Sequence, residues 1–303
     1  QRQMCIRDRP KTDHTPSFKE TFVVLGKNRL LIIVIFAAIL GSTMVTANQC
    51  ADYIGNYIII QNYTNFTQIF QDFLPGAQST LVPNVDAAAA YDFWIPRGTI
   101  VTTLTVAIGV GMVPAMAIFP MLRKKFSLKQ IYIGSALFGL IVHTLCYVVM
   151  AQDVTKANIY VLWVFLFLMG LPLGIYNVIT YALIADSVDY LEWKTGERQE
   201  GVCFAFQTFL SKVNAAVATF VFGQILDGTD FKAVDKSLVD NAGRQIFFQQ
   251  SVDTQKMLLA LVTIVPAVGF LLTIIPMFFN NYTGKVKEQA QNCLLYTSPS
   301  PRD

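Results

Sequence analysis

The sequence predicts an all-α integral membrane protein that crosses the bilayer six times. Hydrophobic residues make up 53% of the 303 residues and charged residues only 14%, whereas a soluble domain carries roughly a quarter charged residues. The charges gather in short clusters between long apolar runs. A transmembrane helix needs about 20 mostly apolar residues, and six such runs follow one another. This repetition argues against a large soluble protein with several buried helices.

The predicted spans follow the apolar runs in order and form a six-helix bundle over residues 30–287. They cover about residues 30–60, 98–122, 131–151, 159–185, 201–226 and 257–280. The first run is longer than a bilayer requires, so we expect it to tilt or to extend beyond the membrane. Two longer polar loops, residues 61–97 and 227–256, separate the spans on one side.

The positions of Lys and Arg predict the orientation of the bundle. Short loops rich in these residues stay in the cytoplasm. If every span crosses, the basic segments fall on one side: residues 10–29, 123–129, 194–198 and 285–287. The loops on the other side are poorer in positive charge, apart from the long loop 227–256, which weighs less in this rule. We therefore expect a multi-pass protein of the inner (plasma) membrane with both ends in the cytoplasm.

The two ends of the sequence differ in composition from the residues beside them. Gln1 to Arg9 (QRQMCIRDR) and Cys293 to Asp303 (CLLYTSPSPRD) resemble translated sequencing-adaptor scars. We expect both to be non-native and the natural chain to be longer, at least on its N-terminal side. Residues 10–29 then form a cytoplasmic loop, and residues 288–303 form a tail. The five cysteines have no paired spacing that predicts a disulfide framework or a metal site.

Lys212 is the candidate for a functional charge inside the membrane. It lies about eleven residues into the fifth span, which places it roughly 16 Å deep. A cation at that depth costs at least about 2.5 kcal/mol, so it must face a partner or a wet cavity. Gln207, Thr208 and Ser211 lie about one turn before it on the same face. A lysine that snorkels to an interface is the alternative, and the depth argues against it.

The stretch from Ala185 to Gly201, ADSVDYLEWKTGERQEG, predicts a charged network where the fourth span leaves the bilayer. Asp186, Asp189 and Glu192 are three residues apart and share one helical face. Lys194 and Arg198 add positive charge in the loop that follows. One interpretation is a solvated loop. The other is an ion-pair network that holds one conformation closed and breaks when it opens.

This stretch, followed by FAFQTFLSKVNAA, resembles the glycoside-pentoside-hexuronide:cation symporter family, typified by melibiose permease, within the major facilitator superfamily. The family has an Ala-Asp-x-x-Asp-Tyr-x-Glu-x-Lys loop, then Arg and Glu before a Gly. Gln-Thr follows in the next helix, with a Lys five residues after the Gln. The matching positions are Ala185, Asp186, Asp189, Tyr190, Glu192, Lys194, Arg198, Glu200, Gln207, Thr208 and Lys212. Val213-Asn214-Ala215 departs from the Gly-rich step of the family.

The resemblance, which spans about Ser17 to Lys287, implies the C-terminal half of a twelve-helix major facilitator fold. The missing N-terminal six-helix bundle would complete the transporter and would hold most of the Na⁺ or H⁺ site. Lys212, Gln207 and Thr208 would line a central cavity for a sugar, glycoside or hexuronate. The acidic loop would form the cytoplasmic gate. In such transporters the two bundles rock around a substrate site at the midplane.

Two further polar stripes supply candidate substrate contacts. Tyr53 ends a stripe in the first span, and its position is similar to an aromatic position of the family. Asn177 lies in a stripe with Thr180 and Tyr181 in the fourth span. For each stripe, hydrogen bonding between helices is an equally good interpretation. His143, midway along the third span, fits a packed residue better than a proton relay.

Other function classes fit the sequence less well. A zinc protease helix needs two histidines four residues apart, and the two His here are distant. Asp186 and Asp189 lie where water reaches them, which disfavours an intramembrane aspartyl protease. The sequence has neither the rings of charged residues nor the filter loop that would predict a channel. A fragment without activity is the remaining alternative. We expect no enzymatic cofactor, metal or nucleic-acid partner beyond the coupling ion, the sugar and the lipid bilayer.

Overall fold

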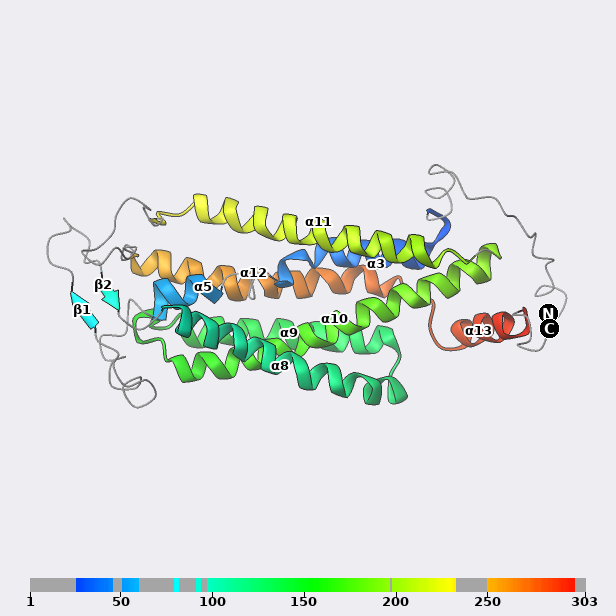
Figure 1. Ribbon diagram of the computed structural model, residues 1–303, viewed down its shortest axis with the longest axis horizontal. Helices are drawn as coiled ribbons and strands as arrows, with labels where there is room; N and C mark the ends of the chain where they lie inside the picture. The colour runs from blue at the N-terminus through cyan, green and yellow to red at the C-terminus, as the bar shows by residue number, and fades with distance from the viewer. Residues whose placement is uncertain are drawn as a thin grey trace.

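The computed structural model describes residues 26–45, 51–59, 79–81, 91–93, 97–196, 198–232 and 250–297. In these residues five long apolar helices run alternately up and down (Figure 1), and each is long and apolar enough to cross a membrane. They are α8 (Arg97–Lys125), α9 (Leu128–Met150), α10 (Ile159–Thr195), α11 (Glu200–Asp227) and α12 (Val252–Phe278). The fold is therefore the predicted helical membrane bundle.

The first predicted span, residues 30–60, is not one continuous helix. It is divided into α3 (Arg29–Leu40), η1 (Ser42–Val45), α5 (Ala51–Ile54) and the π-helical turn η2 (Gly55–Ile59). Residues 46–50 lie outside the described residues. The break follows Leu40, where Gly41 donates its backbone N–H to the carbonyls of Ala37 and Ile39. A side chain of η1 bonds to α12 next to this break, because the hydroxyl of Thr43 donates to the Val265 carbonyl at 3.1 Å.

The remaining elements lie outside the long helices. The predicted polar loop 61–97 contains an antiparallel pair of short strands, β1 (Ser79–Leu81) and β2 (Tyr91–Phe93). A short 3₁₀ turn, η3 (Val154–Lys156), precedes α10, and α13 (Lys285–Thr297) follows α12. The predicted tail is thus helical over most of its length. α10 also continues to Thr195, so residues expected in a loop lie on its last turns.

The two ends of the bundle differ in charge. We call one the basic end, because it carries Arg123, Lys124, Lys125, Lys129 and Lys287. α3 and α9 begin there, α8 and α10 end there, and α13 lies beyond it (Figure 1). The strands β1 and β2 lie at the other end, which we call the hairpin end. The predicted orientation in the membrane rests on this distribution of charge and stays a prediction.

Glycines let the backbones of α8 and α10 approach closely. A Cβ atom built on Gly170 would overlap the carbonyl oxygen of Ile108, and one on Gly111 would overlap the carbonyl oxygen of Phe167. A third glycine, Gly174, meets the backbone of α8 in the same way. Membrane helices associate without a hydrophobic driving force and depend on this kind of contact.

The helices differ greatly in how deeply they are packed. In the most apolar stretch of each helix, 61% of the residues of α12 and 50% of those of α10 are buried, against 11% for α11. Figure 1 shows α11 along one edge of the bundle, on the side opposite α8. α10 and α12 thus form the core, and α11 keeps most of its surface open.

We expect Gly170→Ala to destabilise the bundle by about 1–3 kcal/mol, because the added methyl group forces α8 and α10 apart. Gly134→Ala is the matched control, since a Cβ at Gly134 meets no atom within 4 Å. Thermal unfolding of the two purified variants in detergent measures the difference. Equal melting temperatures would show that the contact between α8 and α10 contributes little.

Candidate functional site

The polar side chains predicted to bind substrate lie on the open surface of α11. Lys212 is exposed and makes no ion pair or hydrogen bond with any residue that the structure describes. Thr208 is also exposed, and its hydroxyl donates to the Phe204 carbonyl at 3.1 Å. The side-chain oxygen of Gln207 is buried and has no hydrogen-bond partner within the described part. Of these three residues, only Lys212 has a polar group that is both exposed and unpaired within the described part, whereas the unpaired oxygen of Gln207 is buried.

An exposed polar face in the middle of a membrane helix requires a further partner. A lysine at this depth is stable only against a counter-charge, a carbonyl group or water, and the described residues supply none of the first two. Phe209 and Phe220 on α11 are also exposed, by 59% and 66%. The open surface of α11 therefore mixes polar and apolar side chains, and its role in lining a substrate cavity stays a prediction.

Asn177 and Tyr53 lie on other helices. Asn177 is exposed on α10, as is Tyr181, one turn further along. Tyr53 is half-buried at the hairpin end, where its ring lies 4.9 Å from that of Phe222 and 5.8 Å from that of Phe231.

Phe222 is ten residues beyond Lys212 on α11, about 15 Å along the helix axis. Tyr53 therefore belongs to an aromatic cluster near the hairpin end, away from Lys212. Direct contact of Tyr53 or Asn177 with substrate stays a prediction.

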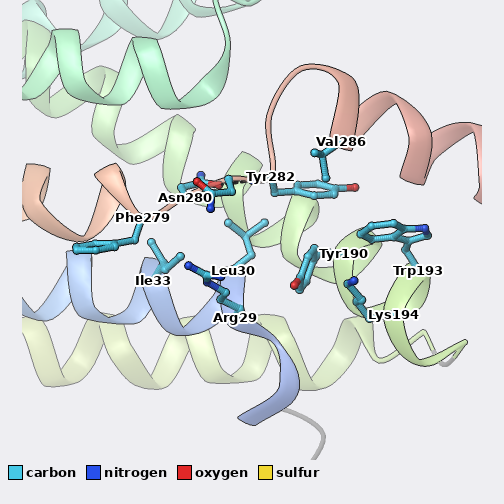
Figure 2. Close-up of a pocket in the computed structure, with 11 residues that line it drawn as sticks. Arg29, Leu30, Ile33, Tyr190, Trp193, Lys194, Phe279, Asn280, Tyr282 and Val286 are labelled. Atoms are coloured by element: carbon cyan, nitrogen blue, oxygen red, sulfur yellow. Dashed lines mark hydrogen bonds between the residues drawn. The ribbon is translucent and has the colours of Figure 1, made fainter.

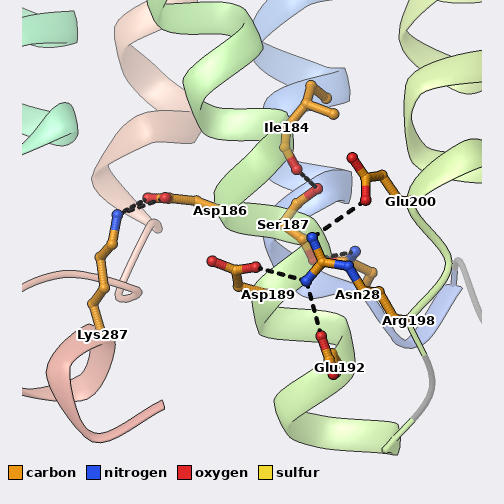
Figure 3. A network of polar contacts seen from close by, with 9 residues as sticks. All are labelled: Asn28, Ile184, Asp186, Ser187, Asp189, Glu192, Arg198, Glu200 and Lys287. Carbon is orange, nitrogen blue, oxygen red and sulfur yellow. Dashed lines mark hydrogen bonds and ion pairs between the residues drawn. The ribbon is translucent and has the colours of Figure 1, made fainter. Parts of the chain in front are cut away.

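The predicted gate contains an ion-pair network centred on Arg198 (Figure 3). Its guanidinium group lies 3.0 Å from Glu192, 3.4 Å from Asp189 and 3.3 Å from Glu200. Glu192 is the least exposed of the three carboxylates, at 7%, so water solvates its charge least and the ion pair with Arg198 stabilises it most. The hydrogen bond with Glu192 is the main reason that the pKa of Arg198 is raised above its usual value. The network joins the end of α10 to the start of α11.

Asp186 forms a separate ion pair with the C-terminal helix. The Nζ atom of Lys287 on α13 donates to both carboxylate oxygens of Asp186, at 2.5 and 2.6 Å. Both side chains are largely buried, at 13% and 17% exposure. This pair fastens α13 to the end of α10 (Figure 3). The sequence predicted Asp186 in the gate but assigned Lys287 only to membrane orientation.

A buried hydrogen bond ties the start of α3 to the same part of α10. The amide of Asn28 donates to the carbonyl of Ser187 at 2.9 Å, and its oxygen accepts from the backbone of Leu31 at 3.1 Å. Asn28 thereby caps α3 and connects it to α10. This contact was absent from the prediction, because a single Asn before an apolar run gives no sign of so distant a partner.

Lys194 lies outside the Arg198 network in which it was predicted. Its ammonium group sits over the ring of Trp193, 4.3 Å from the centroid. Both residues line a cavity of about 170 Å³ at the basic end, with Tyr190, Tyr282 and residues of α3 (Figure 2). The difference has a geometric reason: Lys194 is the residue two positions after Glu192 on a continuing helix, so it points to another face.

Comparison with known protein families gives a match over the larger part of the chain. The model of a family described as MFS/sugar transport protein matches residues 90–284. This range includes every candidate site residue except Tyr53, and it also leaves out Lys287 of the ion pair with Asp186. The match thus covers α8 to α12 together with the polar surface of α11 and the Arg198 network.

Curated proteins with similar sequences carry names of transporters. A putative sulfoquinovose importer of Salmonella typhimurium is 31% identical over 121 residues, 40% of this chain and 23% of that protein. The inner membrane symporter YicJ of Escherichia coli is 29% identical over 141 residues, 46% of this chain and 27% of that protein. A raffinose carrier protein of Pediococcus pentosaceus is 26% identical over 155 residues, 50% of this chain and 22% of that protein. The matched part of this chain thus spans about a quarter of each relative.

We expect Lys287→Gln to release α13 from α10. A hydrogen-bonded charge of this kind contributes about 1.5–3 kcal/mol, so amide exchange over residues 285–292 should become roughly ten- to a hundredfold faster. Hydrogen–deuterium exchange followed by mass spectrometry measures this rate. Lys285→Gln is the matched control, because Lys285 is exposed on the same helix. Equal rates in the two variants would mean that the ion pair does not hold α13.

Proposed function

Since this chain belongs to the MFS/sugar transport protein family, we propose that it forms the C-terminal half of a twelve-helix secondary transporter. The transporter carries a sugar, glycoside or hexuronate by alternating access. The names of the relatives support this assignment, because they include two importers or carriers of sugars and one symporter. An N-terminal six-helix bundle completes the proposed molecule, and the substrate binds between the two halves.

The observation that carries the proposal is the open polar surface of α11. Lys212 stands near the bilayer midplane without a partner among the described residues, and the unpaired oxygen of Gln207 lies on the same helix. Such groups are costly in a membrane unless they contact water, another helix bundle or a polar ligand. A sugar supplies many hydroxyl groups that can pair with the exposed ammonium group of Lys212. A carboxylate or sulfonate group on that sugar would in addition neutralise Lys212.

The ion pairs at the basic end supply the gate of the proposed cycle. Arg198 links α10 to α11 through Glu192 and Glu200, and these contacts hold the described conformation. We propose that they separate when the basic end opens. Partly exposed pairs contribute about 0.2–1 kcal/mol each, so substrate and ion binding can offset their loss.

Coupling to Na⁺ or H⁺ is also part of the proposal, supported by the word symporter in the name of one relative and by the resemblance of the Asp186 to Lys212 region to cation symporters. The cation site is proposed to lie mainly in the N-terminal bundle. Uptake by the full-length transporter in vesicles with an imposed Na⁺ or pH gradient separates the two ions.

We expect Lys212→Ala, made in a full-length transporter with both halves, to weaken sugar binding at least tenfold and to leave membrane insertion intact. Loss of a charged hydrogen bond of about 1.5–3 kcal/mol accounts for this size. Equilibrium binding of radiolabelled neutral glycosides and of a hexuronate measures the effect, and a larger loss for the hexuronate would assign Lys212 to its carboxylate. Lys285→Ala, on the distant α13, is the control. Unchanged uptake by Lys212→Ala would contradict the site assignment.

We expect Arg198→Gln to open the basic end. Cys203, which lies near the start of α11 and is 0% exposed, should then react with a maleimide about two to ten times faster, because the exposed pairs of Arg198 contribute about 0.2–1 kcal/mol each. Peptide mapping by mass spectrometry measures the modification. Cys146, also 0% exposed, is an internal control in α9. An unchanged rate at Cys203, or equal acceleration at Cys146, would argue against a gate.

A further inference from the structure

An apolar groove runs along the outside of the bundle between α8 and α9. It has a volume of about 410 Å³ and is floored by α10 at Ile175. Its walls are formed by Ile118 and Leu122 of α8, and by Phe138 of α9, with Phe126 at the turn between the helices. Ile118, Phe126 and Phe138 remain 46%, 48% and 40% exposed. Large exposed apolar side chains in a membrane helix meet lipid chains or another helix.

Two exposed lysines lie in the last turn of α8, just beyond the groove residue Leu122. Lys125 lies one turn beyond Leu122 and two turns beyond Ile118, so it continues the wall of the groove on the same face of α8. Lys124 and Lys125 are exposed, and neither makes an ion pair with a described residue. Lys129 on α9 differs from them, because it donates to the carbonyls of Phe278 and Asn280 at 2.8 and 3.0 Å.

The few polar groups of the groove are already paired. The hydroxyl of Ser135 donates to the Pro172 carbonyl at 3.3 Å. The side-chain oxygen of Gln130 accepts from the backbone of Ser127 in the capping box of α9. A sugar would therefore find few hydrogen-bond partners here, and burying its hydroxyl groups would be unfavourable. The groove suits an unbranched apolar chain.

We propose that the groove binds an anionic phospholipid, with one acyl chain between α8 and α9 and the phosphate group against Lys125 and Lys124. The length fits this ligand. From Gln130 to Phe138 the groove extends about 12 Å along α9, close to the thickness of one leaflet of a hydrocarbon core of about 30 Å. The charge fits as well, because basic groups beside membrane helices bind the headgroups of anionic lipids.

The test measures lipid binding by the full chain in detergent, using native mass spectrometry with dioleoyl phosphatidylglycerol and dioleoyl phosphatidylcholine. We expect tighter binding of phosphatidylglycerol. Lys125→Gln should weaken it about fivefold, which corresponds to about 1 kcal/mol for one cation near a membrane surface. Lys285→Gln, an exposed lysine on α13, is the control for charge and should change binding less than twofold.

A second pair of variants tests the groove itself. Gly134 lines the groove, and a Cβ there meets no atom within 4 Å, so Gly134→Leu fills the space without disturbing the fold. We expect it to weaken binding of phosphatidylglycerol about tenfold, through the loss of about two buried methylene groups. Gly109→Leu is the matched control, because Gly109 is equally unobstructed and does not line the groove.

Three results would overturn the proposal. Equal weakening by Lys125→Gln and Lys285→Gln would show diffuse attraction to the charged surface. Equal affinity for the two lipids would show that the phosphate of an anionic headgroup is not selected. Unchanged binding by Gly134→Leu would show that the acyl chain lies elsewhere. Each result concerns lipid binding alone, so it stands apart from the transport activity.

Discussion

Polar groups inside the hydrocarbon must find partners within the protein, since each unsatisfied group costs several kcal/mol. Part of the core meets this constraint with short hydrogen bonds between helices, whereas the buried Nε2 atom of His143 and Nε1 atom of Trp163 have no partner among the described residues. The hydroxyl of Thr273 donates to the Ala37 carbonyl at 2.7 Å, so the hydroxyl of Tyr132 must donate to Thr273, at 2.5 Å. These bonds join α9, α12 and α3 around the break after Leu40. Lys212 on α11 differs from these groups, because it is charged and has no partner among the described residues. The proposed substrate cavity rests on this unpaired charge.

The same constraint explains why packing is uneven. α8 and α10 approach so closely at Gly111 and Gly170 that their backbones touch, and α12 is buried from most sides. α11 packs against α3 and η1 along one side, and the Arg198–Glu200 pair at the basic end and the contact of Phe222 with Tyr53 at the hairpin end add to this packing. The side of α11 that faces away from these elements carries the exposed Lys212 and presents it to whatever covers the bundle, which in our proposal is the other half of the transporter.

Local features of the site could be predicted from the sequence, and distant contacts could not. Hydropathy predicted the five long helices, and helical spacing put Asp189 and Glu192 on one face, next to a loop that carries Arg198. Lys287 lies 101 residues from Asp186, so no spacing rule connects them. The break after Leu40 was missed because the polar residues that follow it, among them Ser42 and Gln49, were interpreted as one face of a continuous helix. Lys194 was misplaced because α10 continues beyond the predicted end of the span, which turns its side chain toward Trp193.

α10 connects the proposed gate to the proposed cavity. It carries Asn177 on its open side, and Asp186 lies nine residues later, about 14 Å along the axis. Pro172 precedes both, and a proline inside a helix removes one backbone hydrogen bond. The part of α10 beyond Pro172 forms one helical unit from this weakened turn to the basic end, and Gly174 packs it against the backbone of α8. Because Asn28, Lys287 and Arg198 all attach to this unit, a shift at its cavity face would strain all three contacts at the basic end together.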